Sequence, residues 1–173
     1  MARHHEVQDV MEQMSYGLYI VGSRSGDAAD GMMADWVMQV SFEPRLVALA
    51  FENDARTLEN IRATRAFSIN LLSQDEAGMA LAAKFAQPYY DAKVGGRTVL
   101  AARVHHKLDQ IPHTFGPDGS PVLDAAMAWI ACEAEQFVAA GDHTLVIARV
   151  RDASMVHEGE PLTSRYTGWN YSG

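Results

Sequence analysis

The strongest candidate for direct chemistry in this chain is a histidine that follows a short turn. In the run "AGDHT" a glycine and an aspartate make the turn, and His143 comes next. A histidine can donate or accept a hydrogen bond near neutral pH, and it can stabilise negative charge that develops on a bound ring. On composition alone His143 is an ordinary turn residue, and its place after a tight turn predicts an exposed side chain.

A second candidate is the strongly apolar run "GMMADWVMQVSFEP", residues 31–44. Three polar residues interrupt it close to Trp36, namely Asp35, Gln39 and Ser41. Buried polar groups need hydrogen-bond partners. Either these groups therefore pair within the core, or a bound molecule lies against them. A lone tryptophan in a strand is more often a core aromatic than the wall of a cofactor site.

The run "NDART" brings polar and cationic groups to the expected start of a helix. Asn53, Arg56 and Thr57 lie where the partial positive charge of a helix N-terminus attracts anions, which predicts a phosphate site. A purely structural interpretation is as direct. In that interpretation Asp54 caps the helix and Arg56 is a solvated surface charge.

Other kinds of site have little support in the sequence. His4–His5 and His105–His106 are adjacent pairs, and neighbouring side chains on a strand or helix point in different directions. The chain has no Cys-x-x-Cys or His-x-x-x-His spacing, so we predict no metal site. Cys132 lies in an alternating run and is expected to fill the core. There is no nucleophile elbow, phosphate loop or dinucleotide fingerprint.

The spacing of apolar residues predicts three short helices. The first, over residues 6–17, buries a face made of Val7, Val10, Met11 and Met14. The second, over residues 53–64, buries Leu58 and Ile61. The third is "AGMALAAKFA", which follows a capping box formed by Ser73 and Glu76.

The remaining order is in strands. Apolar runs at residues 18–23, 31–41, 45–52, 66–72, 126–140 and 144–156 fit strands, with a turn near residues 41–44. Residues 24–31 fit a surface loop, and residues 87–122 fit a long irregular excursion rich in glycine and proline. Antiparallel strands closed into a barrel fit this order better than alternating strand and helix units.

The totals set limits on the class of protein. The chain has 173 residues, which suits a single domain over residues 1–173, and 48% of them are hydrophobic. A net charge of −8 argues against a nucleic-acid partner and against docking on an anionic membrane. One cysteine, no signal-like segment and no apolar run of spanning length predict a cytoplasmic protein.

Taken in order, these motifs resemble the flavin reductase-like family, the FMN-binding split barrels. Such proteins carry a Thr-Ala-Ser/Asn-Trp-Val segment, a Val-Ser pair before a proline turn, a Phe-x-x-Asn-x-Leu strand and Gly-Asp-His before another strand. This chain has "ADWVMQVSFEP", "FSINLL" at residues 67–72 and "GDHTLVIARV" at residues 141–150. Met33 replaces the usual threonine and Asp35 the usual serine or asparagine, so side-chain contacts at these two positions are in question.

The resemblance implies a mainly β fold, an antiparallel split β-barrel with a few short flanking helices. It also implies a homodimer that holds FMN, or alternatively FAD, near the subunit interface. Isoalloxazine needs an apolar wall with polar groups at its rim. The implied cofactor-binding residues are Met32, Met33, Ala34, Asp35, Trp36, Gln39, Val40, Ser41, Asn53, Arg56, Thr57, Lys84, Phe85, Ala86 and Tyr166.

The implied activity is reduction of the flavin by NAD(P)H, with hydride passing directly from nicotinamide C4 to flavin N5. His143 is then expected to hydrogen-bond the nicotinamide amide or the reduced flavin. The electrons would pass to free flavin for a monooxygenase partner, to a ferric complex or to another protein. Three alternatives stay open: an FMN-binding electron carrier or sensor without nicotinamide turnover, a pyridoxamine-oxidase-like barrel, and a binding module without flavin.

Overall fold

The computed structural model describes residues 4–86 and 107–169. Its elements are, in chain order, α1 (His4–Met11), β1 (Tyr19–Ser25), β2 (Ala28–Ala34), β3 (Val37–Ser41), β4 (Leu46–Glu52), α2 (Arg56–Thr64), β5 (Ala66–Leu71), α3 (Glu76–Phe85), β6 (His113–Phe115), β7 (Pro121–Leu123), β8 (Ala128–Ala140), β9 (His143–Met155) and α4 (Ser164–Thr167). Most of the predicted irregular excursion, with the His105–His106 pair, lies outside the described residues.

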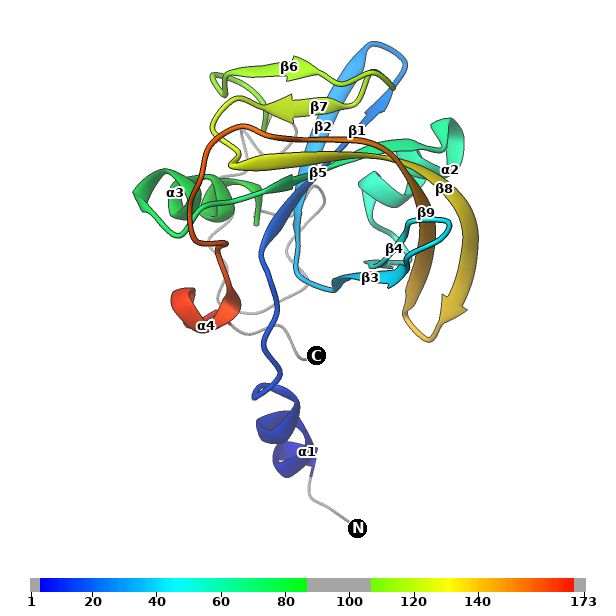
Figure 1. Ribbon diagram of the computed structural model, residues 1–173. Coiled ribbons are helices and arrows are strands. Elements are labelled where there is room, and N and C mark those ends of the chain that lie inside the picture. The colour runs from blue at the N-terminus through cyan, green and yellow to red at the C-terminus, as the bar shows by residue number, and fades with distance from the viewer. Residues whose placement is uncertain (1–3, 87–106, 170–173) are drawn as a thin grey trace.

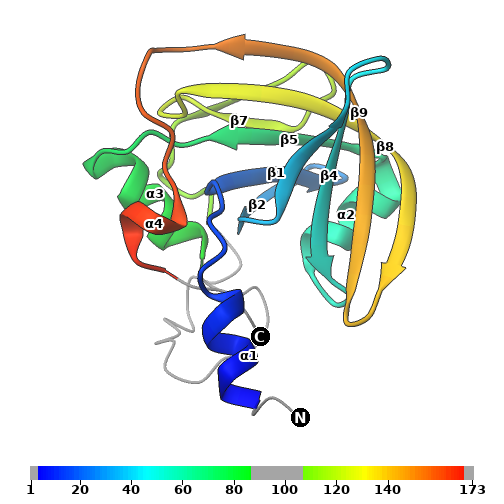
Figure 2. The same cartoon turned by 60° about the horizontal axis from the view of Figure 1, so that its bottom comes forward.

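Seven strands form one antiparallel sheet in the order β2-β1-β5-β8-β9-β4-β3. The two end strands, β2 and β3, are separated in sequence only by Asp35 and Trp36. In a flat sheet of this order they would lie roughly 29 Å apart, at about 4.8 Å per strand, which two residues cannot span. The sheet must therefore curl, and Figures 1 and 2 show β8 and β9 bending round the body. The prediction of a mainly β, antiparallel fold with a few short helices is confirmed.

The inside of the curl holds the main hydrophobic core. Side chains from β1, β2, β4, β5, β8, β9 and α2 meet there, among them Val21, Phe51, Leu58, Ile61, Phe67 and Val146. The predicted buried face of the second helix, Leu58 and Ile61, is confirmed. Cys132 also lies in this core, as expected, and burial raises the pKa of its thiol to about 12.

A second hydrophobic cluster lies between the sheet and α3, where Leu81, Ala82 and Phe85 pack with Ile20. Gly31 of β2 makes this contact close, because a Cβ there would lie 2.7 Å from the Phe85 ring. The predicted helix is present but its cap differs: Asp75 rather than Ser73 is the N-cap, and its carboxylate accepts a hydrogen bond from Gly78 N. A side chain that reaches a free N–H in the first turn stabilises the helix start.

A buried polar network connects β5 to the small β6–β7 sheet. The Asn70 amide donates through Nδ2 to Ile20 O at 3.1 Å and accepts from Leu123 N at 2.8 Å, while the Ser68 hydroxyl donates to Pro121 O. Each bond satisfies a group that has no access to water. Strands β6 and β7 lie within residues predicted to be irregular, and the network supplies the contacts that order β7.

Three other local predictions were wrong. Residues 24–31 are not a loop: β1 and β2 are joined by a tight turn in which Gly26 has a φ of +57°. The first helix ends at Met11, and its apolar residues Val7, Val10 and Met11 are exposed rather than buried. Figure 1 shows this helix, α1, extending away from the body. In the described residues no helix is long and apolar enough to cross a membrane.

Candidate functional site

The junction between β2 and β3 places a tryptophan ring at the rim of the curled sheet. Trp36 leaves β2 and its carbonyl accepts a hydrogen bond from Ala50 N of β4 at 3.1 Å, while Val37 N donates to Asp35 O at 3.0 Å. These hydrogen bonds fix the backbone of Trp36, so the position of the indole ring does not depend on side-chain packing alone.

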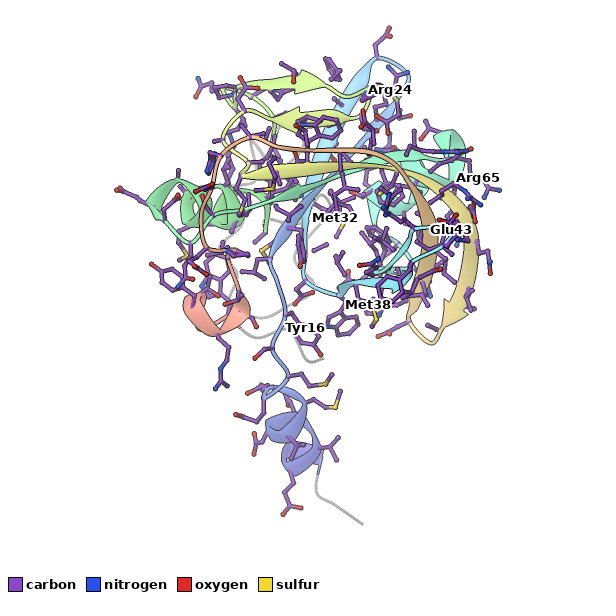
Figure 3. The ribbon with its side chains drawn as sticks, viewed as in Figure 1. Tyr16, Arg24, Met32, Met38, Glu43 and Arg65 are labelled. Atoms are coloured by element: carbon purple, nitrogen blue, oxygen red, sulfur yellow. The ribbon has the colours of Figure 1, made fainter. Side chains whose placement is uncertain are left out.

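His143 lies against this indole ring. The ring centres of Trp36 and His143 are 4.9 Å apart with planes tilted by 41°, and those of Trp36 and Tyr16 are 6.5 Å apart. The expectation that His143 is exposed was wrong, since only 8% of it is accessible. The reason is that β9 begins at His143, and its side chain is covered by an aromatic ring from a distant part of the chain. Figure 3 labels Tyr16, which lies between α1 and the sheet.

The turn between β8 and β9 fixes the histidine. Gly141 adopts a φ of +68°, and Asn53 holds the turn by donating to Gly141 O at 3.2 Å and accepting from the Thr144 hydroxyl at 2.7 Å. Asn53 N also donates to Asp142 O at 3.0 Å. The side chain predicted to meet a phosphate thus connects the end of β4 to the residues around His143.

Asp142 sets the hydrogen-bonding state of His143. Its carboxylate lies 2.7 Å from His143 Nδ1, and this hydrogen bond lowers the pKa of Asp142 below its usual 3.8. An ionised carboxylate only accepts hydrogen bonds, so His143 Nδ1 is the donor in this contact. Because the folded-state pKa is lowered, the contribution of this contact is present above pH 3.8 and is lost as pH falls through the lowered value.

The N-terminus of α2 lies one turn after Asn53. The helix begins at Arg56, and its N-cap is Ala55, which has no side-chain oxygen to accept from the first turn. The prediction that Asp54 caps this helix was therefore wrong. Thr57 is only 2% exposed, and Arg56 pairs with Glu59 at 3.1 Å on the surface. The N-cap residue supplies no capping side chain, and the partial positive charge of a helix start beside a cation suits an oxyanion.

Strand β3 offers a different kind of surface, an edge with exposed apolar side chains. In the sheet of the described residues it pairs with β4 alone, so the backbone groups on its other side point outward. Met38 is 62% exposed and Val40 is exposed as well, and Figure 3 shows Met38 at this edge. Between Gln39 and Ser41 the register shifts, and Gln39 Nε2 donates to Ser41 O at 3.1 Å. Apolar side chains beside outward backbone donors and acceptors suit the rim of a planar heterocycle.

The three residues before this junction divide between the two cores. Met32 and Ala34 pack with the inner core, and Met33 packs with the cluster under α3. This division follows from the alternation of side chains along a strand. Met32 and Ala34 therefore support the site from behind rather than forming an open apolar wall.

The remaining predicted residues lie elsewhere in the fold. Lys84 donates from Nζ to Asp109 O at 2.6 Å, and Phe85 is 1% exposed in the second hydrophobic cluster. Ala86 is the C-cap of α3 and is half-buried. Tyr166 is exposed on α4. Figures 1 and 2 both place α3 and α4 together and α2 on the far side of the sheet, so one chain does not bring these residues to the N-terminus of α2.

Three residues at this site were not among the predicted ones. Tyr16 contacts Trp36, Asp142 contacts His143, and Thr144 contacts Asn53. Asp142 and Thr144 flank His143 in the sequence, and an acidic neighbour of a candidate histidine is a signal that sequence reasoning can use. Tyr16 precedes β1 and carries no such signal. In the described residues no group of three or more His, Cys, Asp or Glu could hold a metal ion.

Comparison with known proteins identifies the family of the chain. The model of the flavin reductase like domain matches residues 11–170. The chain belongs to this family. The resemblance seen in the sequence motifs is thereby confirmed, and the family supports a flavin as the cofactor.

Individual relatives cover most of the chain. The high molecular weight rubredoxin of Moorella thermoacetica is 30% identical over 157 residues, which are 90% of this chain but 63% of that protein. The crystal structure of the flavin reductase PheA2 is 27% identical with a TM-score of 0.73, covering 94% of this chain and 93% of that one. The styrene monooxygenase flavin reductase of Pseudomonas putida S12 is 25% identical with a TM-score of 0.70, covering 91% and 90%.

Proposed function

We propose that this chain binds FMN, takes hydride from NAD(P)H, and passes the electrons to a second acceptor. The observation that carries the proposal is the contact of His143 with Trp36, 4.9 Å between ring centres, beside an exposed strand edge in a flavin reductase like domain. A polar ring fixed against an aromatic one at such an edge suits the alignment of two flat reactants.

The residues present fit FMN at two places. The outward edge of β3, from Met38 to Ser41, presents apolar side chains and backbone groups to the isoalloxazine ring and its polar rim. The start of α2 presents main-chain N–H groups and Arg56 to the phosphate. When bound, FMN supplies the ring atom N5 that accepts hydride from a reduced nicotinamide.

The chain's own contribution is alignment and electrostatics. Trp36 gives a flat surface at the junction of β2 and β3. The His143 ring lies against this surface, and its hydrogen bond to the Asp142 carboxylate fixes how the ring is oriented. His143 would hydrogen-bond the nicotinamide amide or the negative charge of the reduced flavin. Asn53 keeps this histidine in place through the turn at Gly141.

A homodimer completes the proposed site. Helices α3 and α4, which carry Lys84 with its C-cap Ala86 and Tyr166, lie on the other side of the sheet from α2 within one chain, as Figures 1 and 2 show. If all of the implied residues touch one FMN, some must come from a second copy. The exposed apolar side chains Met38, Val40 and Phe42 along the β3 edge and its turn are the kind of surface that a second copy would cover.

The identity of the second acceptor is part of the proposal. The Pseudomonas neighbour is named as the flavin reductase of a styrene monooxygenase. By analogy, we propose an oxygenase that uses reduced flavin as the acceptor for this chain.

The test is an anaerobic titration of the FMN-loaded protein. NADH or NADPH is expected to bleach the flavin absorbance at a rate far above that of free FMN under the same conditions. Protein that is colourless after it has been mixed with FMN and separated from the unbound flavin would contradict the proposed cofactor.

A second candidate function is electron transfer without nicotinamide. It is favoured by the Moorella relative, whose name is that of a rubredoxin. In that case the bound FMN would be reduced by dithionite and not by NADH or NADPH, so the same titration separates the two functions.

A further inference from the structure

Two arginines at the end of α2 share one aromatic ring. The guanidinium carbon of Arg62 lies 4.9 Å from the centre of the Phe137 ring, and that of Arg65 lies 4.8 Å from it. Arg62 also donates to the Thr144 hydroxyl at 3.2 Å, and Arg65 to Ala134 O at 3.4 Å. Each side chain is therefore held both by the ring and by a strand, although both residues are exposed.

Neither arginine takes part in the ion pairs of the described residues. Arg56, Arg149 and Arg151 pair there with Glu59, Glu135 and Glu133. Two adjacent cations without a carboxylate stand out in a chain whose net charge is −8. The C-terminus of a helix favours a cation, but Arg62 in the last turn of α2 already meets that preference.

The backbone conformation at Arg65, the second of the two arginines, favours glycine rather than arginine. Arg65 is the C-cap of α2 with a φ of +63°, a left-handed conformation that strongly favours glycine. An arginine there strains the backbone relative to glycine and places a second guanidinium over Phe137. Local backbone geometry therefore does not explain the residue type, whereas a ligand for the guanidinium does.

The pair has the properties of a phosphate receptor. A guanidinium presents a planar fork of N–H donors that matches a phosphate, and two forks near one point suit a dianion. Because the ring and the strands already order both side chains, an anion that binds here loses less affinity to the ordering of these side chains. Figure 3 shows Arg65 at the outer rim beside β8 and β9, where a ligand can approach.

The pair also lies close to the proposed hydride site. Thr144, which holds Arg62, directly follows His143, and the side chains of successive strand residues point to opposite faces. A ligand that reaches both must cross the turn at Gly141 and Asp142. That turn is open, since a Cβ on Gly141 would meet no atom within 4 Å. An extended nicotinamide dinucleotide has the nicotinamide ring at one end, which would lie at His143. At its adenosine end NADPH carries a phosphate monoester, which NADH lacks.

We propose that Arg62 and Arg65 bind the 2′-phosphate of NADPH and give the protein a preference for NADPH over NADH. The proposal rests on the proposed function, because it needs a nicotinamide at His143. A phosphate monoester carries close to two negative charges at neutral pH, which the two arginines match.

Equilibrium binding tests the arginine site without turnover. Isothermal titration of the FMN-loaded protein with adenosine 2′,5′-bisphosphate and with 5′-AMP is expected to show about tenfold or tighter binding of the bisphosphate. Arg62→Gln and Arg65→Gln should each remove most of this difference. Arg45→Gln, an exposed arginine in the β3–β4 turn, is the matched control and should keep it.

Kinetics test the consequence. The ratio of kcat/KM for NADPH to that for NADH is expected to exceed one and to fall about tenfold in Arg65→Gln. Arg65→Gly should behave like Arg65→Gln, and because glycine suits the left-handed backbone, its effect cannot be assigned to misfolding.

Several outcomes would overturn the inference. One is equal affinity for the bisphosphate and 5′-AMP. Another is a loss of the bisphosphate preference as large in Arg45→Gln as in Arg65→Gln. A third is that the two arginine variants weaken the binding of an acidic protein partner and leave the affinity for the bisphosphate unchanged. If neither nicotinamide reduces the flavin, the proposed function fails, while bisphosphate binding still decides whether the arginines form a phosphate site.

Discussion

Two asparagines do similar chemistry in very different surroundings. Asn70 is fully buried and joins β1, β5 and β7 through its side-chain amide. Asn53 is exposed at the end of β4 and joins the β8–β9 turn through the same kind of bonds. Water can replace the exposed Gly141 partner of Asn53 but not the buried partners of Asn70, so burial decides how much each amide matters for folding.

The difference separates a folding role from a positioning role. The Asn70 network fixes the small β6–β7 sheet, away from the candidate site. The Asn53 contacts hold the turn that carries His143, next to Trp36. We expect changes at Asn70 to alter stability first and changes around Asn53 to alter the proposed activity first.

The largest expected effect is on stability, in Asn70→Leu. Leucine has a similar volume but leaves Leu123 N and Ile20 O without their buried partner, which should cost at least about 3 kcal/mol. Urea unfolding followed by circular dichroism measures the loss. A loss of unfolding free energy as small as that expected for Asn53→Leu would contradict the proposed difference between the two asparagines.

Next is the effect of His143→Ala on flavin reduction. Removing the ring that lies on Trp36 should slow anaerobic reduction by nicotinamide about 10²-fold while FMN stays bound. His113→Ala, on β6, is the matched control and should keep the wild-type rate. Wild-type reduction in His143→Ala would leave the histidine with a structural role only.

A smaller effect is expected on cofactor affinity in Arg56→Gln. The loss of a cation at the start of α2 should weaken FMN binding about tenfold. Glu59→Gln breaks the same surface pair but keeps the arginine, so its affinity should stay unchanged. Quenching of flavin fluorescence measures both. Equal affinities in the two variants would move the phosphate site elsewhere.

The smallest expected change in stability is that of Asn53→Leu, about 1 kcal/mol, because the exposed Gly141 carbonyl becomes hydrated and the buried Thr144 hydroxyl still accepts from Arg62. The variant should still slow flavin reduction, since the turn no longer holds His143. Urea unfolding and stopped-flow absorbance on the same preparation give both values. A large stability loss with unchanged reduction would reverse the two roles.

The sequence predicted the elements whose signal is local. Strand β4 is a continuous apolar run from Leu46 to Phe51, and Leu58 and Ile61 recur at helical spacing, so their burial could be read directly. The motif order also predicted the family and the mainly antiparallel β fold.

What the sequence missed depends on partners far along the chain. His143 follows a turn and still is buried, because Trp36 comes to cover it. Asp54 has a better capping side chain than Ala55, yet the helix starts after Ala55. The shared ring of Arg62 and Arg65 belongs to β8, which no spacing within α2 could indicate.

The structure brings some of the predicted site residues together and not others. Residues joined by the β2–β3 and β8–β9 connections come together, whereas Phe85 packs in the core beneath Gly31. The helical spacing of Phe85 indicates burial but not the surface on which its neighbours lie. Lys84, Ala86 and Tyr166 stay predicted contacts of the flavin, which a second copy of the chain would bring to the site.

The buried thiol of Cys132 offers an experimental handle. It is the chain's single cysteine, and a pKa near 12 keeps it protonated and unreactive toward maleimides in the native protein. A cysteine introduced at exposed Ser154 would then be the one residue that takes a spin label. Electron paramagnetic resonance on the labelled protein then tests the proposed homodimer by the distance between two labels, with no need to delete the native sulfur first.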